Sequence, residues 1–342
     1  MSAIGVLGGY GSVGRAAVAQ LRAWGLGPVL VAGRDRARAQ VVLDAHDDDA
    51  LERWCSTLKL VVNCTGSPPE KRAPVAAAAV RAGIPYLDPD GDEPLHELLA
   101  GGAYARPVVL SAGMLPGLSA LLPRLLVTEP GARLDCYTGG QDLFTIAAAA
   151  DYLAAVSRSA GRTFAVWRGG ARVERAGVPV LEGEVPFFSG PASGVPYLSA
   201  EMERLARRLG LAELVCYSVF PGSRLRETLV GGAVDAAAVV RASELDAFGR
   251  ARYQRLAFQV RGESSMPTVV VSGTGSSELT GAMAALTAQA VLDGAIGPGL
   301  HFAADVLDPA WAERRLRDSD AVTGLRVFDA AADTLEPEEG TI

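Results

Sequence analysis

The fold of this chain is predicted from the stretch IGVLGGYGSVG, residues 4–14, near the start of the sequence. A short apolar run, Ile4–Leu7, leads into glycines spaced Gly9-x-Gly11-x-x-Gly14, and helix-forming residues follow. Strand, glycine turn and helix in this order are typical of a dinucleotide-binding turn.

Each glycine has a physical role in such a turn. Gly9 permits the sharp turn out of the strand, and Gly11 lets the backbone approach a pyrophosphate because it has no Cβ. Gly14 allows the helix to pack closely on the sheet, with the positive end of its dipole facing the phosphates. The intervening residues expected at the same cofactor site are Tyr10, Ser12 and Val13.

The composition is that of an ordinary globular protein. The chain has 342 residues, of which 49% are hydrophobic and 21% charged, so we expect a folded protein of two domains. Its formal net charge of −7 argues against general nucleic-acid binding, which requires a basic face. We therefore predict a protein without a nucleic-acid partner.

Neither a metal site nor a membrane segment is expected. The 4 cysteines form no C-x-x-C pair, and the chain has only 3 histidines. No basic region leads into an apolar segment at the N-terminus, and no uncharged apolar run is long enough to span a bilayer. We expect a cytoplasmic protein.

Apolar runs of strand length alternate with helical patterns over residues 4–111. The further strand-like runs are Pro28–Gly33, Leu60–Cys64, Gly83–Asp88 and Pro107–Ser111. The helical patterns are Arg34–Ala39, Leu51–Leu58, Ala73–Ala82 and Leu95–Leu99. This alternation predicts an α/β fold with a Rossmann-type, doubly wound parallel sheet and helices on both faces.

The alternation ends in the middle of the chain. Strand-like runs occur at Arg133–Tyr137, Thr163–Trp167, Leu214–Phe220 and Thr268–Val271. Helical patterns occur at Ile146–Ser157, Ala200–Leu209, Asp235–Val240 and Ser243–Phe258. This pattern predicts an inserted α+β domain with a mixed or antiparallel sheet.

The end of the second strand bears on the choice of cofactor, because ligands of a doubly wound sheet bind at the carboxyl ends of its strands. Arg34 follows this strand and can pair with the 2′-phosphate of NADP(H), which is the preferred cofactor. Asp35 leaves NAD(H) possible, because an acidic residue here can bind the ribose hydroxyls.

Two further strand ends carry polar residues. Asn63, Cys64, Thr65 and Gly66 follow one strand and are expected beneath the nicotinamide half of the cofactor, with the Thr65 hydroxyl near the ribose. Cys64 is interpreted as a core residue, because no histidine lies near it in sequence to activate a nucleophile.

Tyr86 and Asp88 end the next strand and are candidate catalytic residues. Tyr86 could donate a proton, and Asp88 could orient a substrate amine or contact the cofactor. The alternative for Asp88 is a cap of the following turn. Gly113, after the strand that ends at Ser111, is also expected on the cofactor side.

Six motifs fall in one order along the chain: GGYGSVG (8–14), VAGR (31–34), VNCTG (62–66), PYLD (85–88), SAGMLPG (111–117) and GLHFAADVL (299–307). In this the chain resembles the saccharopine dehydrogenase-like NAD(P)-dependent reductase superfamily. The resemblance implies a discontinuous Rossmann domain, residues 1–118 with 293–342, and an inserted substrate and dimerisation domain, residues 119–292. The chain would return to the first domain through the helix Glu278–Leu292.

The resemblance also implies hydride transfer between NAD(P) and a C=N bond of an imine, thiazoline or opine-type amino acid, in secondary metabolism. His301 lies in the last motif and is a candidate proton donor, because its ordinary pKa suits proton transfer near neutrality. Two alternatives stay open: an enoyl (C=C) reductase acting on a carrier-bound substrate, and a non-catalytic NADP-binding sensor. A small-molecule or carrier-bound substrate and a homodimer are the expected partners.

Overall fold

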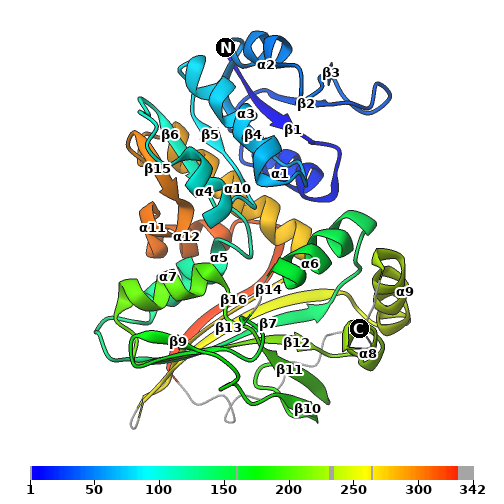
Figure 1. Ribbon diagram of the computed structural model, residues 1–342, viewed down its shortest axis with the longest axis vertical. Coiled ribbons are helices and arrows are strands. Elements are labelled where there is room, and N and C mark those ends of the chain that lie inside the picture. The colour runs from blue at the N-terminus through cyan, green and yellow to red at the C-terminus, as the bar shows by residue number, and fades with distance from the viewer. Residues whose placement is uncertain (1, 159–160, 231–234, 263–264, 330–342) are drawn as a thin grey trace. The chain divides into compact units, whose positions relative to one another are not determined.

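The computed structural model describes residues 2–158, 161–230, 235–262 and 265–329. The chain divides into two compact units (Figure 1). Unit 1 comprises Met1–Leu121 and Ser276–Ala321, and unit 2 comprises Leu122–Gly275 and Val322–Ile342.

Unit 1 is built on a parallel sheet with the strand order β15-β6-β5-β4-β1-β2-β3. Its strands are β1 (Ala3–Leu7), β2 (Val29–Gly33), β3 (Val41–Val42), β4 (Leu58–Asn63), β5 (Tyr86–Leu87), β6 (Pro107–Leu110) and β15 (Gly299–Phe302). The strand order reverses beside β1, which pairs with β2 on one side and with β4 on the other. The predicted doubly wound sheet is confirmed, and its switch point lies at the glycine turn.

Helices cover the sheet in two layers (Figure 1). One layer contains α1 (Ser12–Ala23), α10 (Ser276–Leu292) and α12 (Pro309–Leu316), and the other contains α2 (Asp48–Cys55), α3 (Pro69–Arg81) and α4 (Glu93–Leu99). The short helices α5 (Leu118–Leu121) and α11 (Ala303–Val306) pack on each other. Local sequence explains α2, because the Asp47 carboxylate caps the N–H of Ala50 and acidic residues occupy the first turn.

Helices α1 and α10 lie side by side and run in the same direction. Near their starts, Gly281 packs directly against the backbone of Ala16. Near their ends, the Arg315 guanidinium lies 3.9 Å from the ring centre of Trp24 and donates to Gln289 Oε1 at 2.8 Å. Both helices therefore begin at the carboxyl edge of the sheet.

Unit 2 contains a mixed sheet with the order β10-β11-β12-β7-β13-β14-β16, and β8 pairs with β12 and with β9. Its strands are β7 (Arg133–Gln141), β8 (Val166–Arg168), β9 (Ala171–Val173), β10 (Val180–Gly183), β11 (Ala192–Pro196), β12 (Glu213–Phe220), β13 (Tyr253–Arg261), β14 (Pro267–Gly273) and β16 (Val322–Asp329). Its helical segments are η1 (Leu122–Leu125), α6 (Ile146–Arg158), α7 (Ala200–Leu209), α8 (Ser223–Val230) and α9 (Ala236–Ala247). Strands β7 and β12 are parallel, and the other pairings in this sheet are antiparallel.

The unit boundaries differ from the predicted ranges 1–118 with 293–342 and 119–292 at two elements. Helix α10 belongs to unit 1, because its small residues pack on α1. Strand β16 belongs to unit 2, because it pairs with β14 along its length, with Val327 opposite Val269. Residues 330–342 of the predicted range lie outside the described part of the chain.

Two predicted helices are also wrong. The pattern Ser243–Phe258 spans the end of α9 and the start of β13, whose residues Leu256, Ala257 and Phe258 are fully buried in the sheet. The pattern Arg34–Ala39 forms a turn before β3. Among the described residues, no helix has both the length and the apolar character needed to cross a membrane.

Candidate functional site

The glycine turn joins β1 to α1 at the carboxyl edge of the sheet. The N–H of Gly8 donates to the carbonyl of Ala32 at 2.8 Å, and the N–H of Gly11 donates to the carbonyl of Gly8 at 2.9 Å. A Cβ on Gly14 would lie 2.2 Å from that same Gly8 oxygen. Only glycine fits at position 14, and the first turn of α1 is thereby held against the end of β1.

The start of α1 fits a pyrophosphate group. Gly11 is its N-cap residue and contributes no side-chain cap, and the first turn contains no acidic residue. The leading N–H groups at Ser12 and Val13 are therefore directed to the edge of the sheet without a competing carboxylate in the first turn. Gly9, Tyr10 and Gly14 lie in the same turn, and their contact with the cofactor stays a prediction.

Positive charge gathers beside this cradle at the end of β2. Arg34 follows the strand and is exposed, and Arg15, Arg36 and Arg38 are exposed nearby along the chain or in space. Within the described part of the chain none of these arginines lies in an ion pair. Arg34 is close enough to the Asp44 carboxylate to help lower the pKa of that group, but its guanidinium forms no direct ion pair with it. Guanidinium groups outside direct ion pairs are suited to bind a phosphate monoester.

The ends of β4 and β5 are joined by a buried chain of hydrogen bonds. The Thr65 hydroxyl donates to Asn63 Oδ1 at 2.7 Å, and Asn63 Nδ2 donates to the Tyr86 hydroxyl at 2.8 Å. The Tyr86 hydroxyl in turn donates to Asp88 Oδ2 at 2.8 Å. Asn63 is 1% exposed and Tyr86 and Asp88 are 0% exposed, so these side chains lie behind the surface of the site.

A buried arginine, Arg72 of α3, bonds to the Asp88 end of this hydrogen-bond network. It donates to Asp88 Oδ1 at 3.2 Å, and it also bonds to Asp90 and to the carbonyl of Ser67. Arg72 is 5% exposed. It therefore braces the loop after β4 against the loop after β5.

Arg72 was not predicted from the sequence, although a signal exists. Its position is three, four and seven residues before Val75, Ala76 and Ala79, which form the buried face of α3. A charged residue on the apolar face of a helix requires a buried partner, and that rule points to a carboxylate such as Asp88.

Burial shifts the proton equilibria of this cluster. It raises the pKa of Asp88 even though Arg72 acts in the opposite direction. Burial, reinforced by the Asp88 carboxylate, raises the pKa of Tyr86 well above its usual range. Burial also raises the pKa of the Cys64 thiol, which stays protonated and is a poor nucleophile.

The catalytic roles predicted for Tyr86 and Asp88 are not supported by this geometry. Both are fully buried, and the Tyr86 hydroxyl already accepts from Asn63 and donates to Asp88. Asp88 Oδ1 accepts from the backbone N–H groups of Asp90 and Gly91 at 3.0 and 2.8 Å, which is the capping alternative. Asn63 and Asp88 thus position the loops, whereas Cys64, Thr65 and Gly66 line the edge itself.

His301 is also turned away from the predicted site. It lies on β15 opposite Val109 of β6. Its Nε2 atom lies 3.1 Å from the carbonyl oxygen of Gly297 and 3.3 Å from that of Pro298, both before the start of β15. The imidazole folds back toward the amino end of the strand and points away from the carboxyl edge, so this position does not support the predicted role of proton donor.

The turn after β6 forms the remaining part of the edge. Ser111 is fully buried with a φ of 53°, a conformation that non-glycine residues rarely adopt, and its hydroxyl donates to the Gly91 carbonyl at 2.9 Å. Gly113 is buried, and the N–H of Met114 donates to the Thr280 hydroxyl of α10 at 3.3 Å. The end of β6 is therefore fixed to the loop after β5 and to α10.

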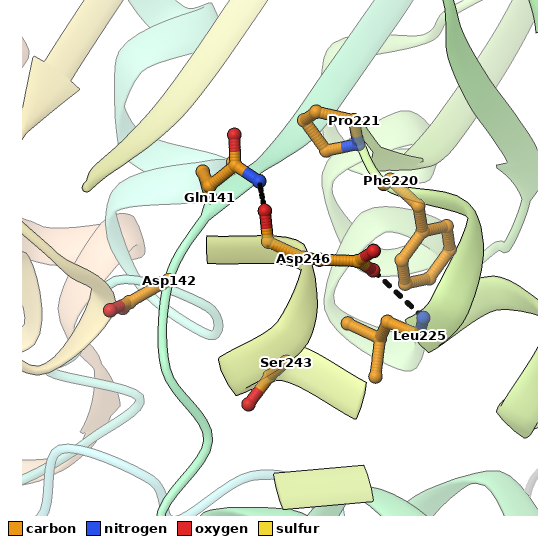
Figure 2. Close-up of a pocket in the computed structure, with 9 residues that line it drawn as sticks. Gln141, Asp142, Phe220, Pro221, Leu225, Ser243 and Asp246 are labelled. Carbon is orange, nitrogen blue, oxygen red and sulfur yellow. Dashed lines mark hydrogen bonds between the residues drawn. The ribbon is translucent and has the colours of Figure 1, made fainter. Parts of the chain in front are cut away.

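A small pocket in unit 2 is lined by groups that already bond to one another (Figure 2). It lies where the parallel strands β7 and β12 end and α8 begins. The Asp246 carboxylate accepts from the N–H groups of Arg224 and Leu225 at 3.2 and 2.8 Å, while its backbone carbonyl accepts from Gln141. The start of α8 is thus already capped by a carboxylate, and we assign this pocket a structural role. In the described part of the chain, no group of three metal-ligating side chains could hold a metal ion.

Comparison with known proteins gives one family match. Residues 4–104 match the model of the saccharopine dehydrogenase NADP binding domain. No curated protein matches the chain. Among solved structures, the chain is similar to saccharopine dehydrogenase (L-Glu forming) from Saccharomyces cerevisiae, with 15% identity, a TM-score of 0.66, and coverage of 97% of this chain and 100% of that chain. It is also similar to the DAP dehydrogenase of C. glutamicum, with 14% identity, a TM-score of 0.47, and coverage of 91% and 95%.

The family match and the fold define an NAD(P)-binding Rossmann domain. More narrowly, residues 4–104 form a saccharopine dehydrogenase-like NAD(P) domain, as the order of the motifs predicted. The nicotinamide cofactor is the group that the glycine cradle fits.

Proposed function

We propose that this protein is an NADPH-dependent reductase that transfers hydride to a C=N bond of a small-molecule or carrier-bound substrate in secondary metabolism. The observation that carries the proposal is the group of arginines without ion pairs at the end of β2, among the described residues. Arg34 directly follows Gly33, so it stands where the adenosine ribose of a Rossmann cofactor lies. A 2′-phosphate is the group that these cations favour.

The reduced nicotinamide supplies the hydride when the cofactor is bound, and the chain must hold the substrate and exclude water. Tyr86 and Asp88 are engaged in the buried network, and the His301 ring is directed away from the edge. A C=N bond that binds as a protonated iminium already carries the required proton on its nitrogen. Reduction of a C=C bond instead requires a proton delivered to carbon, so the side-chain arrangement favours the C=N substrate.

The reaction class is tested by following NADPH absorbance with two groups of substrates. One group contains cyclic imines, thiazolines and amine–2-oxoacid pairs, and the other contains enoyl thioesters. We expect turnover with the first group, with a rate that falls as rising pH deprotonates the imine nitrogen. Turnover of an enoyl thioester alone would overturn the C=N assignment, and tight NADPH binding without turnover of either group would favour the sensor.

The cofactor assignment is tested separately by binding. Replacing Arg34 by alanine removes a charge-assisted contact worth about 1.5–3 kcal/mol, so NADPH binding is expected to weaken roughly 10- to 150-fold. NADH binding should change little, because NADH has no 2′-phosphate. Equal losses for the two cofactors would contradict a phosphate contact at Arg34.

A further inference from the structure

Tyr10 lies between the glycine turn and the end of β2. Its ring packs against Gly33 so closely that a Cβ on Gly33 would lie 2.5 Å from the ring edge. Its hydroxyl accepts the backbone N–H of Asp35 at 3.3 Å. The Tyr10 side chain thus holds the first residues after β2 in place.

Asp35 is folded into its own turn at this point. Its carboxylate accepts the N–H of Ala37 at 2.9 Å, and its carbonyl accepts the N–H groups of Arg38 and Ala39 at 3.1 and 2.9 Å. This side-chain-to-backbone bond is typical of an Asx turn. An acidic residue at the end of the second strand normally binds the ribose hydroxyls of NAD, and here one carboxylate oxygen of Asp35 is instead bonded within the turn, which fixes the direction of the side chain.

The backbone carbonyl of Tyr10 also accepts hydrogen bonds from two arginines. Arg38 donates to it at 2.7 Å, with the guanidinium 4.8 Å from the centre of the Tyr10 ring, and Arg15 donates to it at 3.3 Å. Both guanidinium groups are exposed, and within the described part of the chain neither lies in an ion pair. Two cations held on one carbonyl repel each other, and a dianionic group bound beside them relieves that repulsion.

We propose that Tyr10 is a positioning residue that sets the preference for NADPH over NADH. It acts through Asp35, which its hydroxyl keeps in the turn and away from the ribose, and through Arg38, which its ring and carbonyl present to the 2′-phosphate. This inference rests on the proposed function only in its use of NADPH, not in the substrate that is reduced.

The test is the ratio of NADPH to NADH affinity, measured by calorimetric titration of the purified full-length chain. Tyr10→Phe keeps the ring and removes the hydroxyl, so we expect NADH to bind more tightly and the ratio to fall about 3- to 10-fold, as for a neutral hydrogen bond. Arg38→Ala should lower the ratio by roughly 10-fold or more through weaker NADPH binding. Arg53→Ala, which removes an exposed arginine of α2 outside this group, is the control and should leave the ratio unchanged.

A double variant separates positioning from a general loss of structure. If Tyr10→Phe acts by releasing Asp35, then adding Asp35→Ala removes the gain in NADH affinity. A general disturbance of the turn would weaken both cofactors and would not be reversed by the second substitution, which would overturn the inference. If the unsubstituted protein binds NADPH no more tightly than NADH, the cofactor assignment itself fails. If it prefers NADPH and Tyr10→Phe leaves the ratio unchanged, only the role of Tyr10 fails.

Discussion

Replacing Arg72 by methionine removes one charge from a buried ion pair and keeps much of the side-chain volume. Arg72 is 5% exposed and Asp88 is 0% exposed, so the substitution leaves an uncompensated buried carboxylate. Breaking such a pair from one side costs about 3–5 kcal/mol, and the bonds from Arg72 to Ser67 and Asp90 are lost with it. We expect the free energy of unfolding to fall by that amount in urea denaturation followed by circular dichroism.

The same helix supplies the control. Arg81 of α3 pairs with Glu52, but both side chains are about half exposed. An exposed pair of this kind contributes about 0–1 kcal/mol, so Arg81→Met should have a small effect. Equal losses for Arg72→Met and Arg81→Met would refute the reasoning, because burial is the difference between the two pairs.

If the charge of the Asp88 carboxylate causes the loss of stability in Arg72→Met, that loss should depend on pH. The pKa of Asp88 is already raised by burial, and the loss of Arg72 raises it further. The folded variant therefore takes up a proton at a higher pH than the unfolded chain does, and its destabilisation shrinks as the pH falls through the raised pKa. A loss that stayed constant with pH would show that the charge of Asp88 is not responsible.

Three other predictions concern single residues. Gly14→Ala places a Cβ 2.2 Å from the Gly8 oxygen and should weaken NADPH binding by roughly 10-fold or more in a titration. Gly297→Ala is the control, because an added Cβ there has no atom within 4 Å and should be tolerated. Equal NADPH binding by the two variants would contradict the tight packing at Gly14. Burial raises the pKa of Asp135 to about 6, above the ordinary ~3.9. The free energy of unfolding should therefore fall by roughly 3 kcal/mol as the pH rises from the ordinary pKa to the raised one. Asp135→Asn should flatten that dependence in urea unfolding at several pH values. His301→Ala should change kcat by about 2-fold or less in the NADPH assay, because the ring points away from the site, and a loss of 100-fold would restore His301 as a proton donor.

The parts of the site that were predictable are those specified by local sequence. The glycine spacing fixes a turn within a few residues, and Arg34 follows from its place after a strand of the expected length. The roles of Tyr86 and Asp88 were not predictable, because they depend on Asn63 of the neighbouring strand and on Arg72 of α3. Sequence shows that such groups end a strand, but only packing shows whether they face solvent or one another.

The fold of unit 2 was harder to predict for a related reason. Strand β13 begins six residues after α9 ends, and its buried residues Leu256 and Phe258 are compatible with a helical pattern over a short window. Its neighbours β7 and β14 determine its state, since each pairs with it along most of its length. Strand β16 was placed in the wrong domain because chain order says nothing about which sheet edge a late strand joins.

The late position of β16 has a consequence for synthesis on the ribosome. Unit 1 needs α10, β15 and α12 from residues 276–321 before its sheet and its helix layer are complete. Unit 2 then needs residues 322–329 to cover the edge of β14. An exposed strand edge can pair with another chain, so the nascent protein exposes the apolar strand β14 at the sheet edge until β16 pairs with it and takes the edge position. For the same reason, a chain cut after residue 321 would lose solubility through unit 2 rather than through the cofactor-binding unit.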